Sequence, residues 1–227
     1  MFRFMTAGLL ILTWALPVLA DQTIIQNYDQ ARRIFWADVY PDKPTGRPHS
    51  DIYCGFDFRT RDDVEMQVEH VYPANWIGTA LQCGSRTNCQ ETSERFNLIE
   101  ADLHNLWPSE KNANQLRSNH SFAVINGETW DFEDCDMEKA AAPDDTTPTN
   151  WIIEPRNISR GNIARSIFYM AEEYDLPIEE RLIPLLKQWN KSDRVSADEK
   201  RRNDLIAKVQ GTRNHYIDDP KLVDSEW

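Results

Sequence analysis

Apolar residues recur every three or four positions through the last third of the chain, which is the spacing of an amphipathic helix. The recurrence predicts one helix around 163–174 and a second around 182–189, which Pro184 interrupts. A third helix begins after Ser196, because 196–199 form a capping box, and ends at Gly211. The two apolar stripes are interpreted as core with no cofactor role: Ile163, Ile167, Met170 and Tyr174, then Leu182, Leu185, Leu186 and Trp189.

The first part of the chain combines one helical pattern with two strand patterns. Helical spacing of apolar residues predicts a helix over 23–40, which Pro41 ends. Alternation over 52–58 predicts a strand, and 65–71 predicts a second strand. The segment 75–92 shows neither period, so it is predicted to be irregular.

Capping residues define the helices in the middle of the chain. Ser93 caps a helix to about residue 100, and the extended piece LHNLWP follows. Ser109 occupies an N-cap position with Glu110 in the first turn, which predicts a helix to about Arg117.

Turn residues define the segment that follows. Asn126-Gly127 predicts a hairpin between 121–125 and 129–132, and 140–150 is predicted to be a loop. The chain contains no internal repeat and no linker. Together these patterns predict a single, helix-rich α+β domain over 21–227.

The N-terminus has the pattern of a secretion signal. Arg3 supplies positive charge, 9–19 is apolar, and Ala20 ends a run of small or aliphatic residues. We expect a signal peptide at 1–20 and a mature chain that begins near Asp21. The apolar run is short for a transmembrane span, so no membrane contact is expected after cleavage. An uncleaved anchor is the alternative.

Four cysteines fit an exported chain, because exported proteins meet an oxidising compartment. Cys83 and Cys89 are close enough to close the short loop CGSRTNC, which leaves Cys54 to pair with Cys135. A zinc site is the alternative, but the sequence has no CxxC pair to support it.

The composition is that of a folded acidic protein. The 227 residues carry 25 Lys plus Arg and 37 Asp plus Glu, so the formal net charge is −12. A hydrophobic content of 41% and an aromatic content of 11% exclude a disordered acidic tail. The charge argues against a surface coated with basic groups for nucleic acid, although a few arginines can still hold one phosphate.

A carboxylate and an imidazole stand together in VEHVYP, at the end of the second predicted strand. Glu69 can bind a hard divalent cation, and His70, with an ordinary pKa of about 6.5, can accept a proton at neutral pH. Neighbours on a regular strand point to opposite faces, so both serve one site only where the strand ends or twists. The segments HNLWP and SEKNANQLR follow. Strand, extended segment and Asn-bearing helix come in the order of a ββα-metal site.

This combination of segments is similar to the bacterial endonuclease I family of exported, non-specific nucleases. The matching pieces span about 53–218: YCGFDF, VEHVYP, CGSRTNC, ADLHNLWPSEKNANQLRSN, GNIARSIFYM and RRNDLIAKVQGTRNHYID. The resemblance implies a fold around a ββα-metal (His-Me finger) motif and metal-dependent cleavage of DNA, and often RNA. It also implies 5′-phosphate and 3′-hydroxyl ends, little sequence preference and a periplasmic or secreted location. We expect a monomer.

The resemblance also implies a role for each of five residues. His70 resembles the general base that activates water. Glu69 and Asn114 resemble the protein ligands of one Mg²⁺, with Ca²⁺ or Mn²⁺ as alternatives. Arg86, inside CGSRTNC, resembles the arginine that contacts phosphate. Asn105 matches the residue of the related HNH pattern that ties the hairpin together and helps orient the base.

Other interpretations of these residues stay open. A metalloprotease is disfavoured, because the order EH does not match HExxH. A disulfide-stabilised secreted binding module without activity is the alternative function. Asn112 is the rival of Asn114, and His104 is either a second catalytic group or, as favoured, a structural hydrogen-bonding residue. Core packing is favoured for Trp76 and Trp107, and a solvated helix face for Arg201 and Arg202.

Two features depart from the resemblance. The chain has four cysteines, whereas many members of the family carry more, so its fold must depend more on core packing. Its acidity is unusual for a protein that binds a polyanion, because phosphate binding gains affinity from neutralising cations. The charged groups must therefore be strongly uneven over the surface, or binding must be weak and assisted by the metal.

Overall fold

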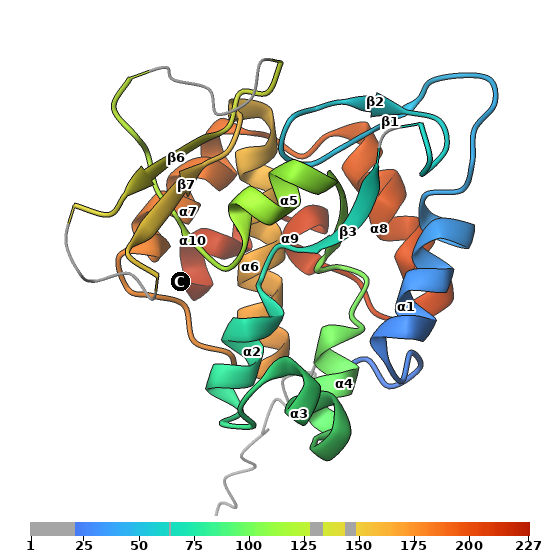
Figure 1. Ribbon diagram of the computed structural model, residues 1–227, viewed down its shortest axis with the longest axis horizontal. Helices are drawn as coiled ribbons and strands as arrows, with labels where there is room; N and C mark the ends of the chain where they lie inside the picture. Colours follow the sequence, from blue (N-terminus) through green and yellow to red (C-terminus); the bar gives the residue numbers. More distant parts are fainter. Residues whose placement is uncertain (1–20, 64, 128–133, 144–148) are drawn as a thin grey trace, which may run out of the picture.

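The computed structural model describes residues 21–227 except 64, 128–133 and 144–148 (Figure 1). Within these residues, helices surround three small β-sheets, which agrees with the predicted α+β class. The predicted signal peptide at 1–20 and the second strand of the predicted hairpin, 129–132, lie outside the described residues.

The N-terminal helix is shorter than predicted. It consists of α1 (Tyr28–Ile34) and a π-helical turn, η1 (Phe35–Val39). The helix begins after Asn27 because the side chain of Asn27 accepts a hydrogen bond from Gln30 N at 3.0 Å. Before that cap, the buried side chain of Gln22 bonds to the backbone of the chain and fixes it in a non-helical path.

The strand predicted over 52–58 is wrong for most of its length. Only β1 (His49–Ser50) and β2 (Asp57–Phe58) pair there, antiparallel to each other. Between them Asp51 accepts hydrogen bonds from the backbone nitrogens of Cys54 at 3.2 Å and Phe56 at 2.8 Å. A carboxylate that takes local backbone donors competes with a sheet ladder, so the chain turns instead.

Next come β3 (Met66–His70), β4 (Leu106–Glu110) and α5 (Lys111–Arg117). The two strands are antiparallel, with Glu69 opposite Trp107, and the strand predicted over 65–71 is confirmed. The helix cap was predicted one residue early. Glu110 is the cap, because its carboxylate accepts a hydrogen bond from Ala113 N at 3.0 Å.

The segment predicted to be irregular, 75–92, is helical. It contains α2 (Ala74–Ala80) and α3 (Arg86–Thr92), and α4 (Glu94–Glu100) follows. Two short helices without a sustained apolar stripe give no clear period in the sequence. The predicted cap at Ser93 is confirmed, because its hydroxyl accepts from Phe96 N at 3.1 Å.

A third sheet lies at the left of Figure 1 and has the order β5-β7-β6. It consists of β5 (Ser121–Phe122), β6 (Glu138–Ala141) and β7 (Trp151–Glu154), with β5 parallel to β7 and β6 antiparallel to it. The loop prediction for 140–150 missed the end of β6. A strand of four residues that is only partly buried carries little alternation.

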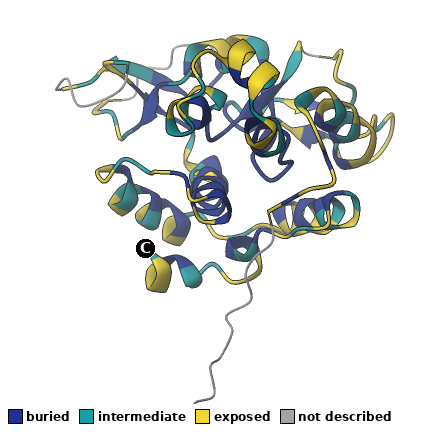
Figure 2. Cartoon of the chain, turned by 90° about the horizontal axis from the view of Figure 1, so that it is seen from below, coloured by how far each residue is buried: buried dark blue, intermediate teal, exposed yellow. Residues whose placement is uncertain are grey.

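The helices of the last third agree with the prediction except at Pro184, which lies in the first turn of α7 and does not interrupt it. After a 3₁₀ turn, η2 (Asn157–Ser159), α6 (Arg160–Tyr174) runs through the interior, and Figure 2 shows buried positions gathered on the inner sides of the helices. Ser196 caps α8 and Gly211, with φ +89°, ends it. The remaining helices are α7 (Leu182–Ser192), α8 (Ala197–Gln210), α9 (His215–Asp218) and α10 (Leu222–Glu226). Among the described helices, none has the length and apolar character needed to span a membrane.

The solvated position predicted for Arg202 is wrong. Arg202 is only 4% exposed, its guanidinium donates to the carbonyls of Leu103 and Leu106, and it lies 3.9 Å over the ring of Trp107. It therefore joins α8 to the start of β4. Arg201 is exposed and pairs with Asp198, as predicted. An arginine on a polar helix carries no local signal that a distant loop will cover it.

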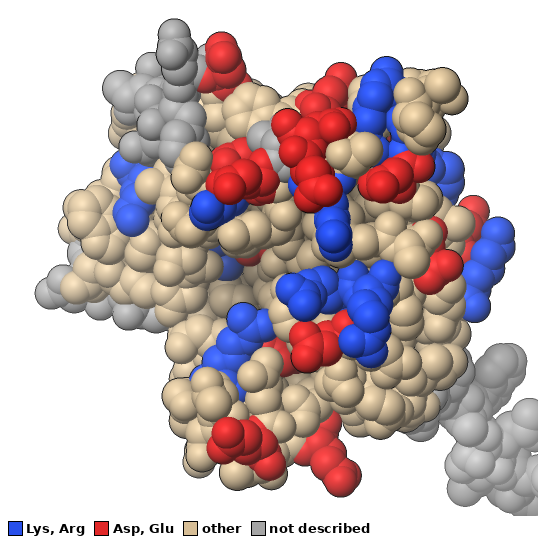
Figure 3. All heavy atoms as spheres, turned by 45° about the vertical axis from the view of Figure 1, so that its right-hand side comes forward, with Lys and Arg blue, Asp and Glu red and all other residues tan. Residues whose placement is uncertain are grey.

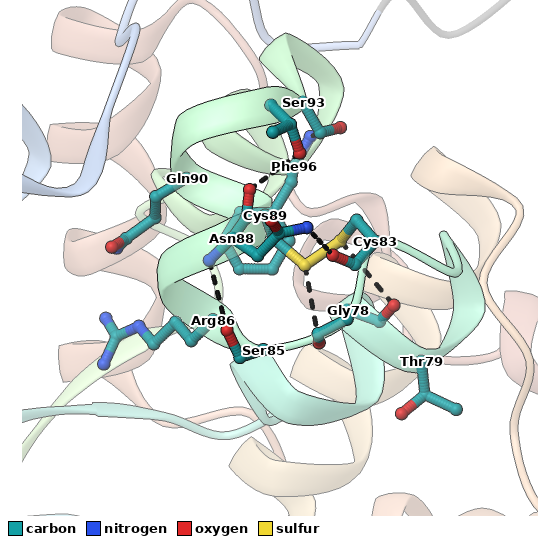
Figure 4. Close-up of a disulfide and its surroundings, with 12 residues drawn as sticks. Gly78, Thr79, Cys83, Ser85, Arg86, Asn88, Cys89, Gln90, Ser93 and Phe96 are labelled. Carbon is teal, nitrogen blue, oxygen red and sulfur yellow. Dashed lines mark hydrogen bonds between the residues drawn. A yellow bond between two sulfur atoms is a disulfide. The ribbon is translucent and has the colours of Figure 1, made fainter.

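Both predicted disulfides are present. Cys54 is bonded to Cys135, and Cys83 to Cys89, and the described residues contain no free cysteine. The first joins the turn after β1 to the segment before β6. The second joins the end of α2 to α3 (Figure 4).

Breaking the two disulfides should have different effects. The sequence separations are 81 for Cys54–Cys135 and 6 for Cys83–Cys89. Loop-closure entropy then gives about 4.5 kcal/mol and about 2 kcal/mol of stabilisation. We expect the double Cys→Ser variant at Cys54 and Cys135 to lose more unfolding free energy in a urea titration. The double variant at Cys83 and Cys89 should lose more nuclease activity. Equal losses of stability would contradict the first part.

Candidate active site

Glu69 lies near the end of β3 and is only 4% exposed. The hydroxyl of Tyr53 donates to Glu69 Oε1 at 2.7 Å, and Arg117 Nε lies 3.5 Å from the same oxygen. Both partners therefore hold Oε1, and neither occupies Oε2. Burial raises the pKa of Glu69 to about 7, although Arg117 and Tyr53 act to lower it.

Arg117, which approaches the Glu69 carboxylate, is itself fixed by packing and by a hydrogen bond. It is fully buried, and its guanidinium carbon lies 4.8 Å from the ring centroid of Phe122 and 5.7 Å from that of Trp76. Its Nη2 donates to Val71 O at 2.7 Å. The last turn of α5 thereby fixes both the strand end and the carboxylate.

His70 is the last residue of β3 and is 7% exposed. Its Nε2 lies 3.0 Å from Glu100 O. A carbonyl only accepts, so Nε2 carries the proton and Nδ1 keeps its lone pair. Burial, with Arg86 as the next cause, lowers the pKa of His70 to about 3. The ring is therefore neutral at ordinary pH, and the hydrogen bond that holds it within the described residues is made by Nε2.

Glu100 connects His70 with Arg86. Besides accepting from His70 through its backbone, it accepts from Arg86 Nε at one carboxylate oxygen and from Gln90 at the other, at 2.9 Å. Figure 4 shows Arg86 and Gln90 on the same side of α3, pointing away from the disulfide. The ring of Tyr28 lies 4.9 Å from the Arg86 guanidinium and 5.0 Å from the His70 ring. Two residues outside the motifs therefore bring the predicted base and the predicted phosphate ligand together.

Asn105 joins the strand ends beside His70. Its Oδ1 accepts from Tyr72 N at 2.6 Å, and its Nδ2 donates to Tyr72 O at 2.9 Å. The backbone adds a third bond, from Val71 N to Asn105 O at 3.1 Å. Because Asn105 is completely buried, these bonds fix the path of the chain directly after His70.

The two asparagines of α5 have different surroundings. Asn114 lines a groove, and its Nδ2 donates to Gln67 Oε1 on β3 at 2.9 Å. Asn112 is exposed and does not line that groove. His104 is completely buried with Nε2 3.0 Å from Thr212 O, in agreement with its structural interpretation.

A groove of about 1230 Å³ runs past these residues. Arg86 and Asn114 line it, whereas Glu69 and His70 are buried next to it: their strand neighbours Gln67 and Val68 form its wall. Figure 3 shows Lys and Arg gathered about a hollow on this face, with acidic side chains on its rim. The further cationic residues of the groove are Arg32, Arg33, Arg61 and Lys111. Three acidic residues also line the groove: Asp42, Asp62 and Glu65. With five cations against three carboxylates, the lining has an excess of two positive charges, although the chain as a whole is acidic.

Sequence reasoning did not identify four residues that hold the site. Tyr53 and Arg117 lie inside quoted motifs, YCGFDF and NQLRSN, but no spacing rule marks them as partners of Glu69. Tyr28 and Glu100 lie in helices that the sequence predicts only as helices. Glu100 carries no sequence signal of its role either, because its burial is a property of the fold.

Comparison with known proteins adds a second line of argument. Residues 18–221 match the family model described as Endonuclease I. The chain is 32% identical to an extracellular deoxyribonuclease of Aeromonas hydrophila, over 73% of this chain and 72% of that protein. It is 33% identical to a periplasmic deoxyribonuclease of the same organism, over 73% and 69%. It is 31% identical to Endonuclease-1 of Buchnera aphidicola subsp. Acyrthosiphon pisum, over 72% and 64%.

Proposed function

We propose, from the premise that the chain belongs to the endonuclease I family, that it hydrolyses phosphodiester bonds of DNA at the groove beside His70. The protein is a nuclease, and it is periplasmic or secreted. The observation that supports the site best is the neutral, oriented His70, which Glu100 joins to Arg86. Directly before it in the chain is Glu69, a buried carboxylate held by Tyr53. The proposal includes RNA as a second substrate and products with 5′-phosphate and 3′-hydroxyl ends.

Nucleases of this family are generally metal-dependent, and the residues here fit a hard divalent cation. Tyr53 and Arg117 both approach Oε1 of Glu69, and neither contacts Oε2. Asn114 donates with Nδ2, and its Oδ1 accepts no hydrogen bond from the described residues. We propose that Glu69 and Asn114 hold Mg²⁺, with Ca²⁺ or Mn²⁺ as substitutes. When bound, such an ion neutralises charge on the phosphate and steadies the leaving 3′-oxygen.

His70 is proposed as the general base in a ββα-metal motif formed by β3, β4 and α5. Its Nδ1 accepts the proton of the attacking water. The bond from Nε2 to Glu100 O keeps the ring in the tautomer that makes this transfer feasible. Asn105 supports the geometry from the other side, because it fixes the backbone directly after His70.

Arg86 is proposed to hold the phosphate. Its Nε donates to Glu100, and within the described residues no carboxylate takes a hydrogen bond from its two terminal nitrogens, although the guanidinium also contacts Tyr28. A guanidinium with these nitrogens available can fork onto two phosphate oxygens. The disulfide that fastens the start of α3 restricts how far Arg86 moves. The other cations of the groove attract the phosphate backbone of DNA locally, whereas the negative net charge of the chain repels it.

The test is cleavage of supercoiled plasmid by the purified mature protein. We expect nicking and linearisation with Mg²⁺, and none with excess chelator. End-labelling of the products should find 5′-phosphates, and parallel assays with single-stranded DNA and RNA determine the substrate range. A binding module without activity would shift plasmid in a gel and leave it uncut in Mg²⁺, and that outcome would overturn the proposal.

Metal binding should depend on pH near neutrality. With the Glu69 pKa at about 7, protons compete with the cation below that pH, because only the ionised carboxylate binds metal. The apparent Kd for Mg²⁺ at pH 6 should therefore be about tenfold higher than at pH 8. The His70 pKa of about 3 means that protonation of the base does not contribute over this range.

Calorimetric titration with Mg²⁺ at both pH values measures this effect. Glu69→Gln is the control, since the amide cannot ionise and its weak binding should not change between the two pH values. An affinity of the unaltered protein that is the same at pH 6 and pH 8 would contradict the prediction.

A further inference from the structure

Three side chains from three helices converge at a corner that the nuclease proposal does not use. Glu172 comes from α6, His215 from α9 and Glu226 from α10, and these helices lie near the C-terminus in Figure 1. One ligand atom of each lies within 4.8 Å of the others. None of the three lines the groove beside His70.

Hydrogen bonds already orient two of the groups toward each other. His215 Nε2 lies 2.8 Å from Glu172 Oε2, and the same oxygen accepts a hydrogen bond from Tyr216 OH. The phenol is in turn fixed by Trp227 Nε1, which donates to it at 2.8 Å. Tyr216 is completely buried, whereas the His215 side chain is 19% exposed and that of Glu172 is 32% exposed. The corner is therefore built on a rigid base and open to solvent on one side.

The charge of this corner is not balanced by a lysine or arginine. Within the described chain, the ion pair of Glu172 is with His215 alone, and Glu226 forms none. Nearby cations are engaged elsewhere: Lys191 pairs with Asp224, and Arg213 pairs with Asp204 and Asp218. Two carboxylates and an imidazole therefore meet here with no lysine or arginine paired to them in the described chain. A divalent cation would supply what is missing.

We propose that Glu172, His215 and Glu226 form a second metal site, which takes Zn²⁺ or a similar transition-metal ion. An imidazole nitrogen with two carboxylate oxygens is a donor set that Zn²⁺ accepts, whereas Mg²⁺ prefers oxygen ligands throughout. Glu226 is exposed, so its side chain is free to rotate toward the other two ligand atoms. Zn²⁺ would need all three at about 2.0–2.2 Å. Water completes the coordination.

Such an ion would fasten the C-terminal helices to the central helix. The chain already holds α10 through buried Val223, through the ring of Trp227, 5.3 Å from that of Phe168, and through the ion pair of Asp224 with Lys191. A bound ion would add a link from α10 to α6 and α9. A ligand that binds only the folded chain raises its thermal stability in proportion to the logarithm of the ligand concentration. The site is thus structural and separate from the nuclease metal, and its role does not depend on the proposed reaction.

The experiment is calorimetric and thermal titration of the full mature protein, freed of metal and then kept in excess Mg²⁺ so that the nuclease site is not available to Zn²⁺. We expect one Zn²⁺ per chain and a rise of several degrees in Tm. Glu226→Gln and His215→Gln should each weaken binding by at least ~10-fold and remove the Tm shift. Glu180→Gln, an exposed glutamate elsewhere, should change neither.

Co²⁺ provides a spectroscopic signature of the imidazole ligand. Its visible absorption should change with His215→Gln and stay unchanged with Glu180→Gln. Glu226→Gln alters an exposed side chain, so it keeps the test valid even if His215→Gln fails to fold. The proposal is overturned if no stoichiometric Zn²⁺ binds, or if Zn²⁺ binds equally well to Glu226→Gln.

Discussion

We expect His70→Ala to lower the turnover of DNA cleavage by ~10²–10⁴-fold, the usual cost of losing a general base. The ring is well suited to that role, because Nε2 is committed to Glu100 O and Nδ1 remains an acceptor. Its pKa of about 3 keeps the ring in the accepting form at neutral pH. The substitution removes the acceptor and leaves Glu69 and Arg86 in place, so binding of Mg²⁺ and DNA should change much less than turnover.

His49→Ala is a matched control. His49 is another buried histidine, 4% exposed, and its Nε2 makes the same kind of contact, 2.9 Å from Pro41 O. It lies in a different pocket from the groove. Both variants lose a buried imidazole that contacts a carbonyl, so both should lose comparable stability. Only His70→Ala should lose turnover, and added imidazole should restore part of it.

Turnover of a folded His70→Ala protein within a factor of a few of the original would reject His70 as the base. Loss of DNA binding together with turnover would instead indicate that the ring holds Arg86 and Tyr28 in place. Gel-shift measurements in Ca²⁺ together with initial rates in Mg²⁺ distinguish the two results.

The sequence predicted those parts of the fold whose cause is local. Ser93 and Ser196 cap helices because a hydroxyl accepts a nearby backbone N–H, and that chemistry needs only three neighbouring residues. The strand with Glu69 and His70 was predictable from its local residue pattern, although its pairing with β4 was not. The 52–58 segment failed because Asp51 takes the backbone donors that a strand would have used.

The candidate site shows the same difference between local patterns, which the sequence reveals, and long-range contacts, which it does not. His70, Glu69, Arg86, Asn105 and Asn114 stand in motifs and were named from the sequence. Their supports were not, because each contact joins segments that are far apart: 16 residues from Tyr53 to Glu69, and 30 from His70 to Glu100. The net charge of −12 also does not reveal a groove lined by several cations, because a composition does not say where on the surface the charged residues lie.

Removal of a proposed metal ligand should have the second large effect on cleavage. Glu69→Ala should reduce cleavage on the order of 10³-fold at fixed Mg²⁺, since a bound cation contributes several kcal/mol to the stabilisation of charge. The variant should also be less stable, because it leaves the fully buried Arg117 without its carboxylate, a loss of about 3–5 kcal/mol. Stability must therefore be measured beside metal affinity.

Asn114→Ala avoids that complication and provides the sharper comparison with Asn112→Ala. The two substitutions are the same, two residues apart on α5, and only Asn114 lines the groove and contacts β3. We expect Asn114→Ala to weaken Mg²⁺ binding by at least ~10-fold and to lower the rate at limiting Mg²⁺. Asn112→Ala, on an exposed position, should leave both nearly unchanged. Titration of the two variants with Mg²⁺ ranks the asparagines directly. If Asn112→Ala weakened the metal more than Asn114→Ala, the ligand would lie on the other face of α5 and the cation would not share the groove with Arg86.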